Sequence, residues 1–183
     1  TTATNSFNTA IGHGAGLDLT TGVQNTLVGG IAGDALTDAD ANVAVGIAAL
    51  SHDTLGSKST AIGSNALNAQ NFTTASDTHN TAVGNFAGVA VTTGIQNTLV
   101  GSLAGDLLTD ADFNTAIGYQ SLSGDTLGSR STAVGWFALG SQNFTTASTS
   151  YNVAVGFGAG SAITTGTGNT FVGSNTGNGN VVT

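Results

Sequence analysis

A five-residue phrase recurs along the whole chain and constrains its fold more than any other feature. It is first met as Asn8-Thr9-Ala10-Ile11-Gly12, and it returns nine times with Asn or Ser at its start and Gly at its end. Successive starts lie about 17 residues apart, or about 21 residues at two places, and such a period is typical of a stack of similar coils. The later copies start at Asn25, Asn42, Ser59, Asn80, Asn97, Asn114, Ser131, Asn152 and Asn169.

Each coil is expected to contain β-strands. If the first residue of the phrase is position one, positions two and four are Thr, Val or Ile, and position five is Gly. β-branched residues followed by Gly are typical of a strand that ends in a turn. Gly is too frequent for helices, so two short strands joined by tight turns are expected in each coil. The sequence therefore predicts an all-β fold, a parallel β-solenoid or β-roll of about ten coils of 17 to 21 residues.

Both faces of the predicted strand are apolar, because position three is Ala, Leu or Phe. Side chains alternate along a strand, so positions two and four share one face and position three lies on the other. We expect positions two and four to fill the interior. Position three would then contact a neighbouring chain, most simply in a homotrimer, or a second packed sheet.

A longer period lies above the coil. Three shorter steps and one longer step form a block of about 72 residues, which is the larger repeating unit of the stack. Residues 8–79 recur with most residues identical as residues 80–151, and a third, partial copy occupies residues 152–183. The whole chain, residues 1–183, is therefore expected to form a single solenoid array with no second domain.

Composition excludes several classes of function. Only 7% of the residues are charged, the net charge is -8, and Lys58 and Arg130 are the only basic residues besides histidine. Nucleic-acid binding requires many cations, so it is not expected. Membrane insertion, which requires a long apolar segment, is not expected either. The chain has no Cys, which excludes disulfides and thiolate metal sites. Abundant Thr, Asn, Ser and Gly with few Lys or Arg favour an extracellular, cell-surface or virion location.

The repeated phrase, as in Asn114-Thr115-Ala116-Ile117-Gly118 with Ser121 at position eight, resembles the head repeats of trimeric autotransporter adhesins. It is also similar to repeat segments of bacteriophage tail fibres. The resemblance covers residues 8–177 and carries no catalytic residues. It implies a left-handed parallel β-roll in which three chains pack about one axis, with an outer surface that binds host material.

A repeated acidic phrase is the strongest candidate for a metal site. Carboxylate oxygens on turns suit Ca²⁺, which would be the only cofactor, although the spacing is not that of an EF-hand loop. The alternative is that these side chains cap turns by accepting hydrogen bonds from nearby backbone amides and keep the rod soluble. The candidate ligands are Asp34, Asp38, Asp40, Asp106, Asp110 and Asp112.

Catalysis and ice binding are not expected. His13, His52 and His79 occupy three different positions in the coil and have no repeated carboxylate or Ser partner, so the chain is not predicted to be an enzyme. Thr recurs at position thirteen, as in Thr20 and Thr37, often beside Gly. A ladder one Thr wide lacks the flat two-dimensional array that ice binding needs.

Two further features point to the surface. Asn71-Phe72-Thr73 and Asn143-Phe144-Thr145 are N-glycosylation sequons in the two longer coils, where protruding loops are expected. The aromatic residues Tyr119, Trp136, Phe137 and Tyr151 would form either an adhesive surface or a contact between chains.

The two ends of the chain match the two halves of a 21-residue coil. Residues 1–8 correspond to residues 145–152, the second half of that coil, and residues 173–183 correspond to the first half, which begins at Gly63. One chain would complete the open coil of the next, giving a head-to-tail homopolymer. The expected assembly residues are Thr1, Thr2, Ala3, Phe7, Asn169, Asn175, Val181 and Val182.

These observations favour a structural subunit of an extracellular β-solenoid fibre that assembles with itself. The alternative is a phage tail-fibre or trimeric adhesin segment that binds a cell-surface glycan. The two differ in whether the outer surface contacts further copies of the chain or a sugar.

Overall fold

A computed structural model describes residues 5–178, in which every regular element is a β-strand. Ten three-residue strands begin at position two of successive phrases, and four two-residue strands lie in the region of the longer coils. None of the described elements is a helix that could cross a membrane. The three-residue strands are β1 (Thr9–Ile11), β2 (Thr26–Val28), β3 (Val43–Val45), β5 (Thr60–Ile62), β7 (Thr81–Val83), β8 (Thr98–Val100), β9 (Thr115–Ile117), β11 (Thr132–Val134), β13 (Val153–Val155) and β14 (Thr170–Val172). The two-residue strands are β4 (Gly56–Ser57), β6 (Ser76–Asp77), β10 (Gly128–Ser129) and β12 (Ser148–Thr149).

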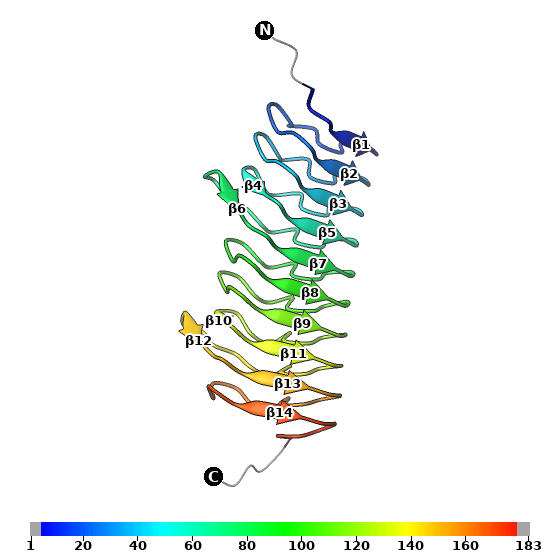
Figure 1. Cartoon of the computed structure of the whole chain (residues 1–183). Coiled ribbons are helices and arrows are strands. Elements are labelled where there is room, and N and C mark those ends of the chain that lie inside the picture. Colours follow the sequence, from blue (N-terminus) through cyan, green and yellow to red (C-terminus); the bar gives the residue numbers. More distant parts are fainter. Residues whose placement is uncertain (1–4, 179–183) are drawn as a thin grey trace.

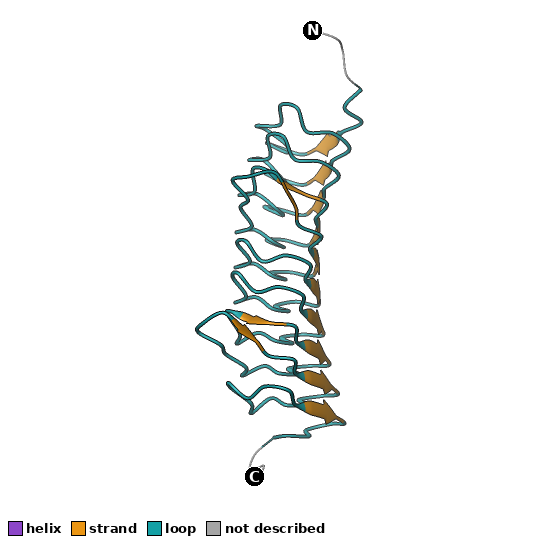
Figure 2. Ribbon diagram, turned by 60° about the vertical axis from the view of Figure 1, so that its left-hand side comes forward, coloured by secondary structure: helices purple, strands orange, loops and turns teal. Residues whose placement is uncertain are grey.

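The ten longer strands form one parallel sheet that runs the length of the molecule (Figure 1). Each strand pairs with the same three positions of the next coil, so that Thr98 lies beside Thr115 and Val100 beside Ile117. β1 and β14 are the two edge strands, at opposite ends of the rod (Figure 1). This arrangement confirms the predicted parallel β-solenoid of about ten coils. The expected two strands per coil are found only in part, because most coils contain one strand and complete their circuit by turns (Figure 2).

The predicted orientation of the strands was wrong. Position three points into the coil and is fully buried from Leu27 to Ala154, while positions two and four face outward. The outward residues are half-buried or exposed, and each lies in register beside its equivalents in the neighbouring coils. Sequence pattern could not distinguish the two faces, since both are apolar, and the narrow interior is filled better by Ala and Leu than by paired β-branched side chains.

Complementary volumes fill the interior. Position nine is Leu in some coils and Gly in others, and Gly stands where a large position-three side chain takes the space. A Cβ on Gly33 would lie 2.8 Å from the Cδ2 atom of Leu27, and one on Gly88 would lie 2.6 Å from the Cδ1 atom of Leu99. In the coil whose position three is Ala44, position nine is Leu50, which fills the same region and is fully buried. The core is therefore packed to high density across neighbouring coils.

The glycine at position five is required by the close stacking of the coils. Gly101 has φ of 134°, and a Cβ there would lie 2.5 Å from the carbonyl oxygen of Gly118 in the next coil. The same conflict repeats at the equivalent glycines from Gly12 to Gly156. The phrase therefore ends in Gly because another coil passes directly over its backbone.

Buried asparagines at position one join each coil to the next. The Asn25 Oδ1 atom accepts a hydrogen bond of 2.9 Å from the backbone N–H of Asn42, and the Asn25 Nδ2 atom donates one of 2.7 Å to the Ala39 carbonyl oxygen. Asn97 and Asn114 repeat both contacts. Each amide thus bonds two coil segments and leaves no polar group of its own unpaired in the interior.

Two buried polar networks replace this ladder in the 21-residue coils, where position one is Ser. Gln70 donates to the Asp53 Oδ2 atom over 2.6 Å and to the Ser59 Oγ atom over 3.0 Å, and its Oε1 atom accepts from Asn80. Asp53 is fully buried and also accepts from the backbone N–H groups of Gly56 and Phe72. The second super-repeat holds the same network on Asp125, Gln142, Ser131 and Asn152. The added residues of the long coil therefore bring their own hydrogen-bonding partners.

Replacing Gly101 by Ala is expected to destabilise the rod by about 2–3 kcal/mol, because the new Cβ meets backbone and φ is positive. Gly30→Ala is the matched control, since no atom lies within 4 Å of its Cβ, and its effect should stay within about 0.5 kcal/mol. Urea unfolding followed by circular dichroism measures both. Equal stability of the two variants would contradict the stacking argument.

Candidate functional site: the outer surface and ends of the rod

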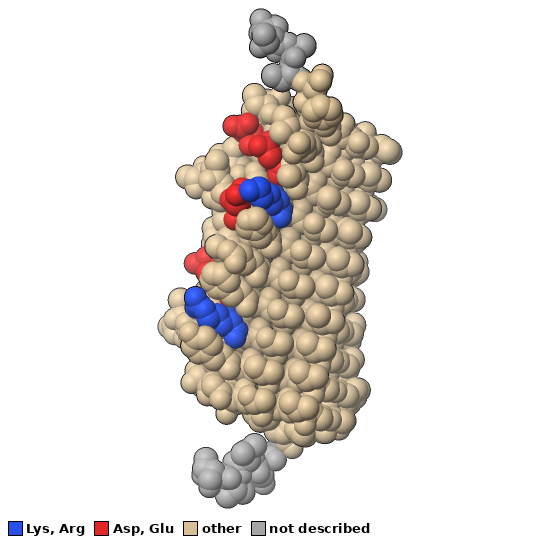
Figure 3. All heavy atoms as spheres, viewed as in Figure 1, with Lys and Arg blue, Asp and Glu red and all other residues tan. Residues whose placement is uncertain are grey.

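The outer face of the ten-stranded sheet, called here the sheet face, carries only Thr, Val and Ile side chains. It consists of the residues at positions two and four of each five-residue phrase. Position two is Thr except for Val43 and Val153, and position four is always Val or Ile. None of its residues is ionisable, whereas Lys, Arg and Asp gather along the opposite, loop side in the view of Figure 3. The rod therefore presents one long uncharged face.

An aromatic ridge lies just beyond the strands, at position six of three successive coils. It consists of Tyr119, Trp136 and Phe157, whose exposed fractions are 47%, 43% and 53%. The rings of Trp136 and Phe157 are stacked, with centroids 4.6 Å apart and planes 13° apart. Phe137 contacts Trp136 with a centroid distance of 5.4 Å. The predicted Tyr151 lies outside the ridge, directly before position one of its coil.

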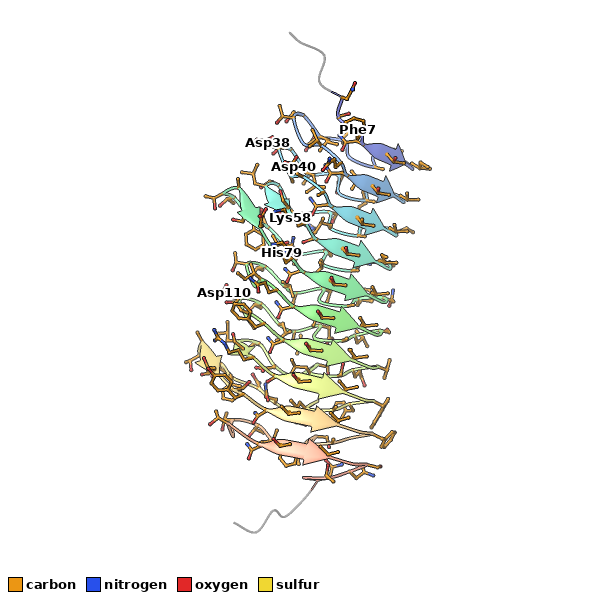
Figure 4. All side chains as sticks on the ribbon, viewed as in Figure 1. Phe7, Asp38, Asp40, Lys58, His79 and Asp110 are labelled. Atoms are coloured by element: carbon orange, nitrogen blue, oxygen red, sulfur yellow. The ribbon has the colours of Figure 1, made fainter. Side chains whose placement is uncertain are left out.

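The acidic phrases lie on the loop side, and their carboxylates bond neighbouring coils one by one. The Asp38 Oδ1 atom accepts from the Thr21 hydroxyl, and the Asp40 Oδ1 atom accepts from the Val23 backbone N–H over 2.8 Å. Figure 4 shows Asp38 and Asp40 on the loop side of the rod. Asp110 and Asp112 make the same contacts to Thr93 and Ile95. The bonds are those of caps between coils.

No three carboxylate or histidine groups among the described residues converge on a point where a metal ion could bind. One oxygen each of Asp34 and Asp106 is buried without a hydrogen-bonding partner in this part of the chain. Desolvation by burial raises the pKa of the Asp106 carboxyl. The structure therefore does not bring the six predicted calcium ligands together, and the capping interpretation accounts for four of them.

The histidines and the two cations make local contacts. The His52 Nδ1 atom lies 2.9 Å from the Asn68 carbonyl oxygen and 3.2 Å from the Ser51 Oγ atom. The hydrogen bond from Lys58 lowers the pKa of the exposed Asp77 carboxyl, with a smaller contribution from the charge of His79. Arg130 lies over the Phe113 ring, 4.8 Å from its centroid. Lys58 and Arg130 occupy equivalent positions of the two super-repeats, and the contacts of these groups within residues 5–178 do not join them into one site.

The two sequons lie in the loops that project from the 21-residue coils (Figure 2). Asn71 and Asn143 are exposed, and so are Thr73 and Thr145, while the intervening Phe72 and Phe144 are buried. Glycosylation at Asn71 and Asn143 stays a prediction, and the exposure of both side chains is compatible with it.

The predicted assembly residues lie at the ends of the rod. Phe7 is 71% exposed and has φ of 52°, close to the 52° of His79 and 49° of Tyr151 at the equivalent position. Asn169 accepts no hydrogen bond at Oδ1 among the described residues, although it donates to Asn152 as its equivalents do. Asn175 bonds the Phe157 carbonyl oxygen through its backbone N–H. Thr1, Thr2, Ala3, Val181 and Val182 lie outside the described residues.

No protein-family model, curated protein or solved structure matches this chain.

Chelation with EDTA is expected to leave the melting temperature unchanged, because the structure assembles no set of ligands around a metal ion among the described residues. A metal ion bound only by the folded state would stabilise it, so its removal would lower the melting temperature. Differential scanning calorimetry with added Ca²⁺ and with EDTA measures this. A fall on chelation that Ca²⁺ reverses would restore the calcium hypothesis.

Proposed function

We propose that the chain is a structural subunit of an extracellular fibre and that copies of it stack end to end. The observation that carries the proposal is the complementary hydrogen-bonding pattern of its first and last described coils. Every coil inside the rod is bound to both neighbours by the same backbone bonds of the ten-stranded sheet, while β1 and β14 each have one neighbour among the described residues.

Three repeated bonds specify how such a junction would form. The backbone N–H at position one donates to the Oδ1 atom of the preceding Asn, as Asn25 does to Asn8. The N–H at position two donates to the position-one carbonyl of the following coil, as Thr9 does to Asn25, and the N–H at position five donates to the position-four carbonyl of the preceding coil, as Gly29 does to Ile11. The second and third rules use only backbone groups, which recur in every coil, and the first uses the side chain of the Asn at position one.

Applied across two copies, the rules join the last coil of one chain to the first coil of the next. Asn8 of one copy would donate to the Asn169 Oδ1 atom of the other, and Thr170 would donate to the Asn8 carbonyl oxygen. Ala10 is exposed and Phe171 is half-buried, although their equivalents inside the rod are fully buried. The junction would cover both apolar side chains, and because the contact is heterologous it would produce an open filament.

Ala10→Lys is expected to abolish filaments, because the cation would lie in the apolar interior of the junction. Thr74→Lys, in an exposed loop, adds the same charge away from the ends and should leave filament length unchanged. Electron microscopy of the parent and both variants, with circular dichroism to establish folding, measures the effect. A parent that stays as single rods at high concentration, or an Ala10→Lys variant with filaments of normal length, would contradict the proposal.

The aromatic ridge is proposed as the contact through which rods associate laterally, in the homotrimer that the resemblance implies or in a larger bundle. Exposed aromatic side chains are enriched at protein interfaces. A glycan-binding segment, the second candidate, would need aromatic faces open to a sugar ring. Trp136 and Phe157 cover one face of each other, which favours packing between chains over sugar binding.

Trp136 is the only tryptophan of the chain, so its fluorescence reports on this contact directly. Lateral association would remove Trp136 from water, and its emission should move to shorter wavelength as the concentration rises. The Trp136→Ser variant contains no tryptophan, so its association is followed by sedimentation. Its mean mass should be lower than that of the parent at the same concentration. The proposal fails if parent emission and mass are independent of concentration, or if Trp136→Ser associates as strongly as the parent.

A further inference from the structure

The sheet face has the two-dimensional order needed to bind a crystalline surface. Adjacent strands are paired in register from β1 to β14, so each outward side chain lies beside its equivalent in the next coil. Within a row the spacing is the strand separation of about 4.8 Å, and positions two and four lie about 6.6 Å apart along the strand. The array is two residues wide and, over ten strands, on the order of 45 Å long.

This array differs from the Thr ladder at position thirteen, for which ice binding was not expected. That ladder, at position thirteen, includes Thr20 and Thr37, whose hydroxyls donate to backbone carbonyls of the next coil. The outward Thr of the sheet face, such as Thr98 and Thr115, donate no hydrogen bond to the described part of the protein, so their hydroxyls remain available to water. The Thr row of the sheet face is also one Thr wide, but a parallel row of Val and Ile lies beside it, so the ordered array is two residues wide.

The side chains of the sheet face are held in place before any ligand arrives. Thr, Val and Ile are β-branched and have restricted χ1 rotamers. Each strand is also fixed at both ends, by the Asn ladder at position one and by the close backbone contact of the glycine at position five. Binding to an ordered surface would therefore cost little side-chain entropy.

The chemistry of the sheet face suits ordered water. One row offers a hydroxyl and a methyl group at most strands, and the other offers methyl groups only. Methyl groups restrict the orientation of first-shell water, and hydroxyls donate to and accept from it. Because the sheet face carries no charge, its electrostatics match a neutral water lattice, whereas the charged groups of the loop side orient water around themselves.

We propose that the sheet face binds ice. Water ordered over the methyl groups and anchored by the Thr hydroxyls of this regular array can join the ice lattice. Binding needs only a single folded chain and does not depend on fibre formation.

The experiment uses the full chain in two assays, thermal hysteresis in microlitre droplets and the shape of single ice crystals. The parent is expected to open a hysteresis gap and to facet the crystals. Thr98→Lys with Thr115→Lys places two cations at the centre of the array and should reduce both effects to those of buffer. Thr74→Lys with Thr146→Lys is the matched control, because both residues are exposed in loops, and it should retain the parent's activity.

Circular dichroism and melting temperature establish that both double variants are folded. A parent that neither shapes ice nor opens a hysteresis gap at millimolar concentration overturns the proposal, whatever the variants do. It is overturned equally if the folded Thr98→Lys, Thr115→Lys chain is as active as the parent. Filament formation, measured separately on the Ala10→Lys variant, distinguishes failure of the fibre proposal from failure of this one.

Discussion

The structure depends on stacking coils of identical backbone conformation one strand spacing apart. Each coil donates to and accepts from its neighbours at the same positions, so a deviation in one coil would remove bonds from two others. Gly101 and its equivalents permit this spacing because no Cβ fits between their backbones. The repeat in sequence is thus the consequence of a repeat in three dimensions, since every coil must meet the same steric demand.

The same constraint accounts for backbone conformations that would be unfavourable in isolation. Non-glycine residues adopt positive φ at corresponding corners of many coils, among them Leu103, Phe113 and Arg130. Such conformations cost free energy and persist only where the surroundings specify them. Here the surroundings are the neighbouring coils, whose ladders of backbone bonds and buried Asn amides are formed only when each corner turns in the same way.

Burial of polar side chains contributes order as well as stability. Asn97 and Gln142 lie in the interior with their amides bonded, and Asp125 accepts three hydrogen bonds while fully buried. An unpaired partner in such a network would be costly, so the networks favour one stacking register over its alternatives. The sheet face benefits from this order, because its outward rows follow the register set by the interior.

The sequence by itself determined the period, the all-β class and the parallel solenoid, because these follow from identical residues recurring at fixed spacing. It also located Asn71 and Asn143 on protruding loops from the four extra residues of their coils. Only the tertiary structure decided which strand face is inside. Position three, as in Ala116, and position four, as in Val100, are both apolar. Which of the two positions lies inside depends on the width of the coil, which no short sequence pattern encodes. That choice turned the Thr and Val rows outward. The stacking of the coils also decided the role of Asp38 and Asp40, because each carboxylate accepts a separate hydrogen bond from the neighbouring coil.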